Sequence, residues 1–254
     1  MSAAFALPPR AWAMLVLTEA RMVVRDTAGL VVPLGLPVLI MVMNGIGAGG
    51  EGREHFRGLP ALDAFVVPLT IVMVVALIGV VNMPSFLASY RKAGVLRRLS
   101  VTPAHPASVL AAQVVVSLAQ ALLGVALALL VARLAFGVSM PRAPFTAAGV
   151  FLLAAAAMYA LGMVVAALAP TPNSAVAIGL VLFFATMAVG GGFGGRGNLP
   201  GWLDAAGGHL PYGAGLDALS DAWTGAAPDP AQLGALAGTA VLAAAVAART
   251  FRWS

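Results

Sequence analysis

The sequence predicts an all-α integral membrane protein with six transmembrane helices. Of its 254 residues, 61% are hydrophobic and only 9% are charged, whereas about 25% are charged in a soluble domain. The mean hydropathy is +0.98. So few charges cannot cover the surface of a soluble protein of this length. The chain has no cysteine, which excludes disulfides, thiolate metal sites and cysteine nucleophiles.

Six apolar stretches approach or exceed the roughly 20 helical residues that a bilayer requires. They cover about residues 30–46, 64–83, 109–136, 144–168, 175–189 and 233–248. We expect Asn82–Pro84 to close the second stretch, and the tight turn Pro170–Asn173 to join the fourth and fifth. The fifth ends in the glycine-rich run Gly190–Gly195, where a helix break is expected because glycine has low helix propensity.

Residues 10–27 predict a helix that lies on the membrane surface. Its basic residues are Arg10, Arg21 and Arg25. On a helical wheel these three fall within about 60° of one another, as an interfacial helix requires. Trp12 suits the headgroup region. Glu19 is the exception to the pattern, because it falls on the apolar side.

The stretch Tyr90–Gln113 carries four basic residues and no acidic one. The four are Arg91, Lys92, Arg97 and Arg98. Such a cationic block cannot lie in hydrocarbon, so it belongs at a membrane surface, and the cytoplasmic side is favoured. Val95, Leu96 and Leu99 share one helical face, and the arginines point elsewhere. We therefore expect a short helix along the membrane with one face free to dock a cytoplasmic partner.

The charge distribution predicts that both termini are cytoplasmic. With six spans, nine of the 14 basic residues fall on the side of the termini, and seven of the nine acidic residues fall on the other. The net charge of +5 therefore reports orientation in the membrane. A nucleic-acid partner is not expected.

The chain has no recognisable enzymatic motif. Its only lysine, Lys92, stands between Arg91 and Ala93, so no Gly-Lys-Ser/Thr phosphate loop is present. The three histidines are isolated, and neither HExxH nor GxSxG occurs. We expect no catalytic residue, metal or cofactor on this chain. Asp217 and Asp221 are four residues apart and could bind a cation or relay protons, but an exposed pair at the membrane surface is expected.

Polar groups within the spans are candidates for a substrate route. They are Asn44, Asn82, Gln113, Gln120 and Thr186. Such groups face the interior of a bundle, where they either make ordinary interhelical hydrogen bonds or line a pathway. Apart from Asp63 at the edge of a span, no ionisable residue is expected near mid-membrane. This weakens the case for a carrier driven by protons or sodium ions.

The segment from 196 to 230 is too broken to span and too apolar to be a solvated loop. A pair of interfacial or re-entrant short helices is expected there. Its candidate functional residues, within 196–225, are Pro200, Trp202, Pro211, Tyr212 and Asp217.

Two motifs carry a resemblance to a known family. The run Gly-Val-Leu-Arg-Arg-Leu-x-x-Thr-Pro at Gly94–Pro103 resembles the cytoplasmic loop of ABC-2-type transporter permeases, especially the daunorubicin-resistance type of multidrug exporter. The second motif, at Asn198–Leu203, Leu210–Tyr212 and Leu216–Leu219, is similar to the family's segment before its last span. The chain departs from the family by lacking an acidic residue before Gly94 and by having Ser220 where arginine is common.

The resemblance implies a permease subunit of an ATP-binding-cassette exporter in a bacterial-type plasma membrane. Such a subunit pairs with a second permease copy, identical or related, and with a separate nucleotide-binding ATPase that carries ATP and magnesium. The loop 90–106 would present a coupling helix to a groove of the ATPase. The docking residues implied are Arg91, Lys92, Gly94, Val95, Leu96, Arg97, Arg98 and Leu99. The helix at 10–27 would brace this joint, and the outer segment would cap the exit.

The resemblance also implies that the substrate is hydrophobic or amphiphilic, such as a drug, a secondary metabolite or a lipid-like molecule. Two other classes of protein remain as alternatives. An ion-coupled carrier or channel would need no ATPase partner. An intramembrane enzyme would need an embedded nucleophile, metal or carboxylate cluster, and the sequence offers none.

Overall fold

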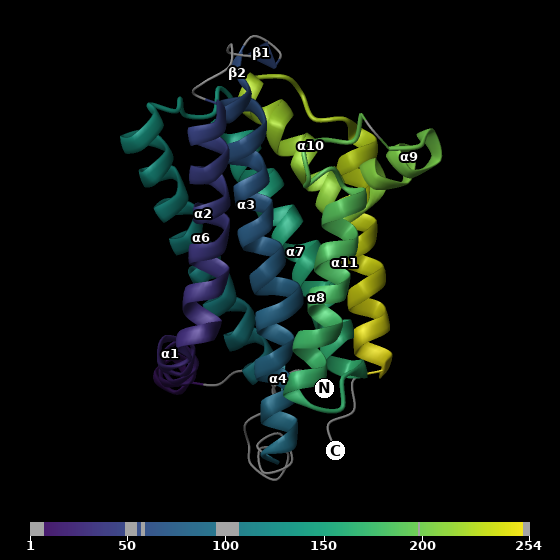
Figure 1. The fold of residues 1–254 in the computed structure, drawn as a ribbon. Helices are drawn as coiled ribbons and strands as arrows, with labels where there is room; N and C mark the ends of the chain where they lie inside the picture. Colours follow the sequence, from purple (N-terminus) through teal and green to yellow (C-terminus); the bar gives the residue numbers. More distant parts are fainter. Residues whose placement is uncertain (1–7, 49–54, 57–58, 95–106, 198, 251–254) are drawn as a thin grey trace.

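The computed structural model describes residues 8–48, 55–56, 59–94, 107–197 and 199–250. Within these residues, six helices are long and apolar enough to cross a membrane. The described strands are limited to the short antiparallel pair β1 (His55–Phe56) and β2 (Leu59–Pro60). The predicted all-α membrane fold is therefore confirmed, and the long helices stand side by side as a bundle (Figure 1).

Five of the spans are single α-helices. They are α2 (Thr27–Ala48), α6 (Ala107–Phe136), α7 (Pro144–Leu168), α8 (Pro172–Val189) and α11 (Pro230–Thr250). The remaining span is a continuous run of π-helix η1 (Leu62–Val66), α3 (Val67–Ala76), π-helix η2 (Leu77–Asn82) and α4 (Met83–Lys92). Three shorter helices complete the described fold: α1 (Pro9–Arg25), α9 (Gly201–His209) and α10 (Pro211–Thr224). Each predicted range lies within one of the six spanning helices.

The second span does not close at Asn82–Pro84, as we expected from its proline, but continues to Lys92. The reason lies in the π-helical turn that precedes Pro84. The N–H of Met83 bonds five residues back, to the carbonyl of Ile78, and Pro84 then falls in the first turn of α4. A proline is tolerated there because its missing N–H coincides with a change of hydrogen-bonding pattern.

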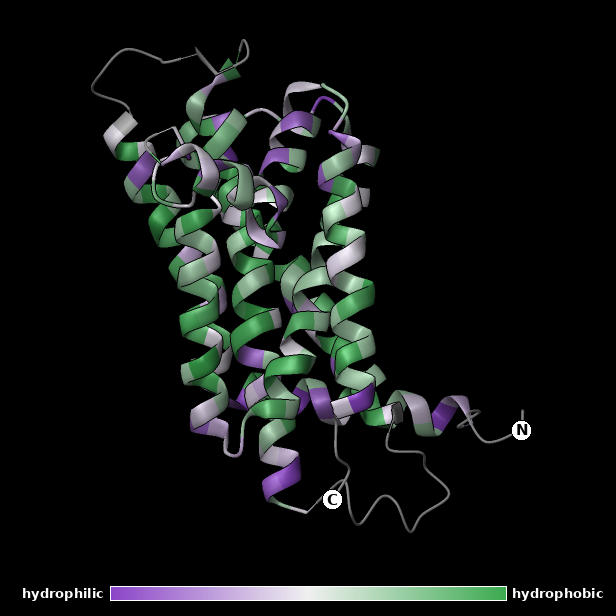
Figure 2. Ribbon diagram, turned by 90° about the vertical axis from the view of Figure 1, so that its right-hand side faces the viewer, coloured by the Kyte–Doolittle hydropathy of each residue, from purple (hydrophilic) through white to green (hydrophobic). Residues whose placement is uncertain are grey.

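This run, Leu62–Lys92, is the central helix of the bundle. In its membrane-spanning window 89% of the residues are buried, compared with 33% for α2 and α6, 22% for α8 and 17% for α11. Large apolar side chains of the outer helices, such as Leu39, Leu130 and Leu242, are exposed. In Figure 2 the hydrophobic residues, coloured green, extend over most of the length of the long helices. Hydrocarbon is the environment that suits such surfaces.

Glycines let two helices touch the backbone of η2. A Cβ on Gly162 of α7 would lie 1.9 Å from the carbonyl oxygen of Gly79, and a Cβ on Gly179 of α8 would lie 2.4 Å from that of Val80. Small residues at such crossings bring membrane helices close enough for extensive van der Waals contact. The crossings therefore hold α7 and α8 against the same π-helical turn.

The two ends of the bundle differ. We call one the α1 end, because α1 lies across it, seen end-on in Figure 1 and from the side in Figure 2. The end of α4 and the C-terminal end of α11 lie at this end as well. The opposite end, which we call the α9 end, carries β1, β2, α9 and α10.

The Gly162 crossing predicts a position-specific effect of alanine. Gly162→Ala places a methyl group against a backbone carbonyl and is expected to destabilise the protein by about 1–3 kcal/mol, as overpacking does. Gly149→Ala on the same helix is the matched control, because a Cβ there meets nothing within 4 Å, and helix propensity favours alanine. Thermal unfolding of the purified protein measures both. Equal effects of the two variants would contradict the crossing.

Candidate functional site

At the α1 end, α1 is attached to the bundle through its inner face. Val23 packs with Phe86 of α4 and Val116 of α6 in a small buried cluster. On the same face Glu19 is 5% exposed and accepts a hydrogen bond from the hydroxyl of Tyr90 near the end of α4. Glu19 is the residue that breaks the amphipathic pattern of the α1 sequence. Its side chain lies against the central helix, where it contacts Tyr90.

Burial raises the pKa of the Glu19 carboxyl above its ordinary value of 4.5, and the Tyr90 hydroxyl partly offsets this effect. Burial therefore makes the Glu19 carboxyl harder to ionise than a solvated one. The other polar side chains of α1 face outward: Arg10, Arg21 and Arg25 are exposed, and Trp12 is half-buried.

Arg91 lies in the last turn of α4, and its guanidinium reaches the end of α7. Its Nη2 donates to the carbonyl oxygen of Ala166 at 2.9 Å and to that of Ala169. These carbonyls belong to the C-terminal end of α7, where a cation also interacts favourably with the helix dipole. The sequence predicts Arg91 in a short docking helix, but Arg91 lies on the central helix and is hydrogen-bonded to α7.

The rest of the predicted docking segment begins where α4 ends. Lys92 is the last residue of α4 and is exposed. Gly94 follows with φ of +66°, a left-handed conformation that glycine adopts at no steric cost. Val95, Leu96, Arg97, Arg98 and Leu99 lie outside the described residues.

Two of the polar residues predicted within the spans form one network. Asn82 donates to the side-chain oxygen of Gln120 at 3.2 Å, and both side chains donate to the carbonyl oxygen of Gly29, at 2.8 Å and 2.7 Å. The network joins the central helix, α6 and the start of α2. It satisfies a backbone carbonyl that hydrocarbon could not.

The other three candidates are separate from it. Asn44 is exposed and bonds to the carbonyl of Ile40 in its own helix. Thr186 likewise bonds to Leu182. Gln113 is 1% exposed, and its Oε1 has no hydrogen-bond partner among the described residues.

At the α9 end, hydrogen bonds fasten the loop between α6 and α7 to its neighbours. Asp63 accepts from the backbone N–H of Ser139 at 3.1 Å and from its hydroxyl at 2.5 Å. The indole N–H of Trp223 donates to the carbonyl of Ser139 at 3.2 Å, and the N–H of Arg142 donates to the carbonyl of Trp223 at 3.2 Å. Asp63, expected at the edge of a span, thus binds the start of the central helix to this loop.

Glycine contacts set the position of α10 in the bundle. A Cβ on Gly207 of α9 would lie 2.1 Å from the carbonyl oxygen of Val189, and one on Gly213 of α10 would lie 2.1 Å from that of Gly207. The end of α8, α9 and α10 therefore pack backbone against backbone. As a result α10 is sunk into the bundle, and most of its residues are buried.

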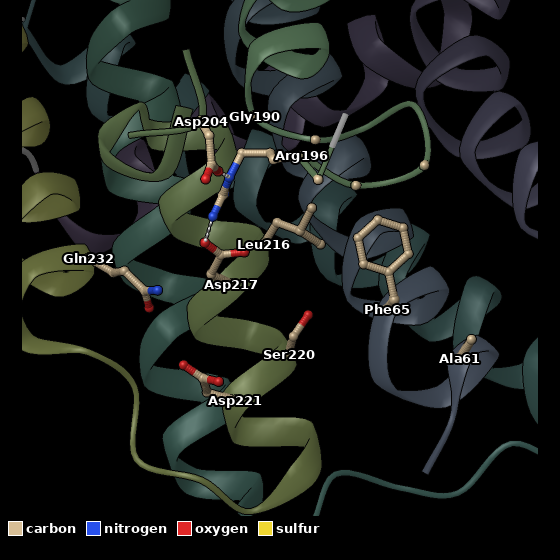
Figure 3. A pocket seen from close by; sticks show the side chains of 14 residues that line it. Ala61, Phe65, Gly190, Arg196, Asp204, Leu216, Asp217, Ser220, Asp221 and Gln232 are labelled. Carbon is tan, nitrogen blue, oxygen red and sulfur yellow. Dashed lines mark hydrogen bonds and ion pairs between the residues drawn. The ribbon is translucent and has the colours of Figure 1, made fainter. Parts of the chain in front are cut away.

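A cavity of about 670 Å³ lies between α10 and the glycine-rich loop after α8 (Figure 3). Its lining side chains include Phe65 of η1, Leu216, Asp217, Ser220 and Asp221 of α10, Gln232 of α11, and Arg196 and Asp204. The Arg196 guanidinium pairs with Asp217 at 2.6 Å and with Asp204 at 2.9 Å. Partial burial opposes the charge of Arg196, but these bonds outweigh burial and raise its pKa.

The expectation that Asp217 and Asp221 form an exposed pair is wrong. Asp221 is 6% exposed, and Asp217 is half-buried in its ion pair with Arg196. The two carboxylates line the cavity because α10 is sunk into the bundle.

The other predicted residues of this segment divide between the surface and the interior. Trp202 is 72% exposed on α9, and Pro200 is also exposed. Pro211 and Tyr212, at the start of α10, are buried. Tyr212 packs edge-on against the ring of Phe183.

Sequence reasoning did not identify Arg196, Ser220 or Gln232 as site residues. Arg196 carried a usable signal, since it is a single cation beside a segment with several aspartates. Ser220 stands out in the sequence only as a departure from the family's pattern, and Gln232 does not stand out at all, because their place in the cavity depends on how α10 and α11 pack.

The buried Glu19–Tyr90 contact predicts a pH-dependent mutant effect. Tyr90→Phe is expected to destabilise the protein at neutral pH by about 1–3 kcal/mol, because the buried carboxylate loses its donor. The destabilisation should diminish as the pH falls towards 4.5, since a group whose folded pKa is raised is accommodated best when protonated.

Glu19→Gln is the control for this effect. An amide can still accept from Tyr90 and does not titrate, so this part of the pH dependence should disappear. Thermal unfolding followed across this pH range in lipid or detergent measures both variants. A Tyr90→Phe effect that is the same at every pH would contradict the assignment.

Comparison with known proteins agrees with the architecture. A family profile described as ABC-2 type transporter matches residues 10–222, which include the first five spans and nearly all of α1 and α10. A search of curated proteins gave no match. The chain is a multi-pass membrane protein that belongs to the ABC-2 type transporter family and serves as a membrane-spanning permease subunit of an ABC transporter.

Proposed function

We propose that this permease moves a hydrophobic or amphiphilic substrate out of the cytoplasm with ATP hydrolysed by a separate subunit. A nucleotide-binding ATPase docks on the segment after α4, and a second permease copy, identical or related, completes the transporter. ATP and magnesium belong to the ATPase subunit. The membrane is of the bacterial plasma-membrane type, with the α1 end and both termini in the cytoplasm.

The observation that carries the proposal is the central helix. One continuous helical run joins the predicted docking segment at one end to the cavity at the other, where Phe65 forms part of the lining. It is buried along most of its length, so a displacement at its α4 end must be accompanied by repacking of the surrounding helices. ATP binding can then shift the conformational equilibrium through different contacts at the docking segment in the two states.

Contacts at the α1 end support the same conclusion. Tyr90 joins α4 to α1, and Arg91 joins it to the end of α7. The last turn of α4 is therefore braced on two sides just before the docking segment begins. Force applied there is transmitted to α1 and α7 as well as to the central helix.

The orientation rests on the basic residues of α1 and α4. Arg10, Arg21, Arg25 and Lys92 are exposed at the α1 end. Basic residues close to the ends of spans favour the cytoplasmic side. The paired Arg97 and Arg98 suit an ATPase surface with acidic residues.

An ion-coupled carrier or channel is the alternative. Such a protein would need ionisable groups along the route. In the described part of the chain, the buried carboxylates are those of Glu19, Asp63 and Asp221. They lie near the two ends of the bundle, in contacts at the joints of α1, η1 and α10. Because these carboxylates lie at the ends of the bundle and not along a route through it, their placement favours transport driven by a separate ATPase over ion-coupled transport.

Charge reversal at the docking segment tests the partner. Arg97→Glu combined with Arg98→Glu is expected to abolish copurification of the ATPase and ATP-dependent efflux, while membrane insertion stays intact. The matched control is Arg249→Glu with Arg252→Glu, which reverses two charges predicted to lie on the same side of the membrane. Unchanged complex formation and efflux in the first variant would refute the docking role.

Single cysteines test the orientation, because the chain has no cysteine of its own. Ser100→Cys is expected to react with a membrane-impermeant maleimide only after the cytoplasmic side is opened. Ala227→Cys, at an exposed position just after α10, should react in intact cells. The reverse pattern would invert the topology.

A further inference from the structure

We propose that a groove between α6 and α7 binds an anionic phospholipid, with an acyl chain in the groove and the phosphate at Arg133 and Arg142. This lipid is a resident of the bilayer and not the transported substrate, so the inference goes beyond the proposed function. The groove shares no lining residue with the cavity of Figure 3.

The groove has a volume of about 410 Å³ and opens on the outside of the bundle. Its deep part is formed by Ile71 of α3 and by Leu219 and Trp223 of α10, which are all buried. Its rim is exposed: Leu122 of α6 is 51% exposed, and Met140, in the loop between α6 and α7, is 64% exposed. The groove is therefore accessible to the bilayer that surrounds the protein.

The groove follows α6 inside a membrane span. Leu122, Val125 and Leu129 line it from one face of α6 and cover about 10 Å of the helix axis. All three lie within the span Ser108–Phe136. The lining side chains are apolar, and the indole N–H of Trp223 already has its acceptor in the loop between α6 and α7. Because these side chains offer a ligand no polar partner, an acyl chain suits the groove better than a polar molecule does.

Two arginines stand where the groove reaches the α9 end. Arg133 is one helical turn beyond the lining residue Leu129, on the same face of α6. Arg142 directly follows Pro141, another lining residue, in the loop that leads to α7. Both arginines are exposed. The groove therefore runs from hydrocarbon at its α6 wall to positive charge at the membrane surface, which is the order of polarity in a phospholipid.

The two guanidinium groups retain charge and donors for a phosphate. Arg133 donates to the carbonyl oxygen of Val138 at 3.0 Å, and Arg142 donates to that of Thr224 at 3.4 Å. A carbonyl carries no net charge, and the ion pairs among the described residues are made by Arg196. Neither charge is thus compensated by a described carboxylate. A guanidinium has five N–H donors, and its planar fork matches phosphate oxygens.

The fluorescence of Trp223 reports on the groove directly, because this side chain lines it. In a chain with Trp12, Trp202 and Trp253 replaced by phenylalanine, Trp223 is the sole tryptophan. The probe is phosphatidylglycerol with dibrominated acyl chains, because bromine quenches a tryptophan that it approaches closely. It is expected to quench the purified chain in detergent at a concentration at least about tenfold lower than dibrominated diacylglycerol, which has the same chains and no phosphate. Neither the ATPase nor transport is involved.

Removal of the two charges tests the phosphate contact. Arg133→Gln combined with Arg142→Gln is expected to weaken quenching by phosphatidylglycerol about tenfold and to leave quenching by diacylglycerol unchanged. Both side chains are exposed, and glutamine can still donate to the same carbonyls, so the fold should be retained. The matched control is Arg21→Gln with Arg25→Gln, which removes two exposed charges at the α1 end and should leave both affinities unchanged.

Filling the groove tests the acyl-chain contact. Ala148 lines the groove from α7 at an exposed position, so Ala148→Phe is expected to abolish quenching by both lipids. Ala156→Phe is the control, because Ala156 is exposed on the same helix but does not line the groove.

Three outcomes would overturn the proposal. They are equal affinity for both lipids, unchanged affinity for phosphatidylglycerol after removal of the two charges, and equal quenching in the two phenylalanine variants. A second permease copy is the other occupant that would suit an apolar groove. Cross-linking of two copies through Leu122→Cys, without quenching by phosphatidylglycerol, would identify that occupant and refute the lipid.

Discussion

The structure depends on how the central helix satisfies its polar groups while it is enclosed by other helices. Its backbone bonds stay within the helix, even through two π-helical segments. Its side chains are apolar except at a few positions, and most of these make defined contacts: Asn82 with Gln120, Tyr90 with Glu19, and Asp63 with Ser139. Away from water each such group needs a partner. These pairs therefore fix which helices surround the central helix and how each neighbour is positioned along its axis.

The fold class and the spans followed from composition and hydropathy, since a bilayer imposes a minimum length on any apolar helix. The extension of the second span to Lys92 could not be predicted from the sequence, because a proline such as Pro84 usually marks the end of a helix. The π-helical turn that accommodates Pro84 has no recognisable sequence pattern. Glu19 shows the opposite case. Its place on the apolar side of α1 marked it as unusual, and only the position of Tyr90 explains why it is there.

The cavity was less predictable than the spans. Asp217 and Asp221 are spaced to share a helical face, which the sequence shows, but whether that face meets water or protein is decided by the depth of α10. That depth is set by backbone contacts at Gly207 and Gly213, and a glycine in a sequence does not reveal what approaches it. Asp217 also needed Arg196 as its partner, 21 residues earlier in the chain.

The glycine crossings at the π-helical turn have a mechanical consequence. At the two crossing points, Gly162 of α7 and Gly179 of α8 bring backbone directly against the backbone of the central helix. Sliding one of these helices along another would force Cα atoms over carbonyl oxygens, at a steep steric cost. The three helices are thus expected to move as one rigid body. The displacements of a transport cycle would then fall on the more exposed α2 and α6, whose lipid-facing surfaces can exchange lipid contacts with little resistance.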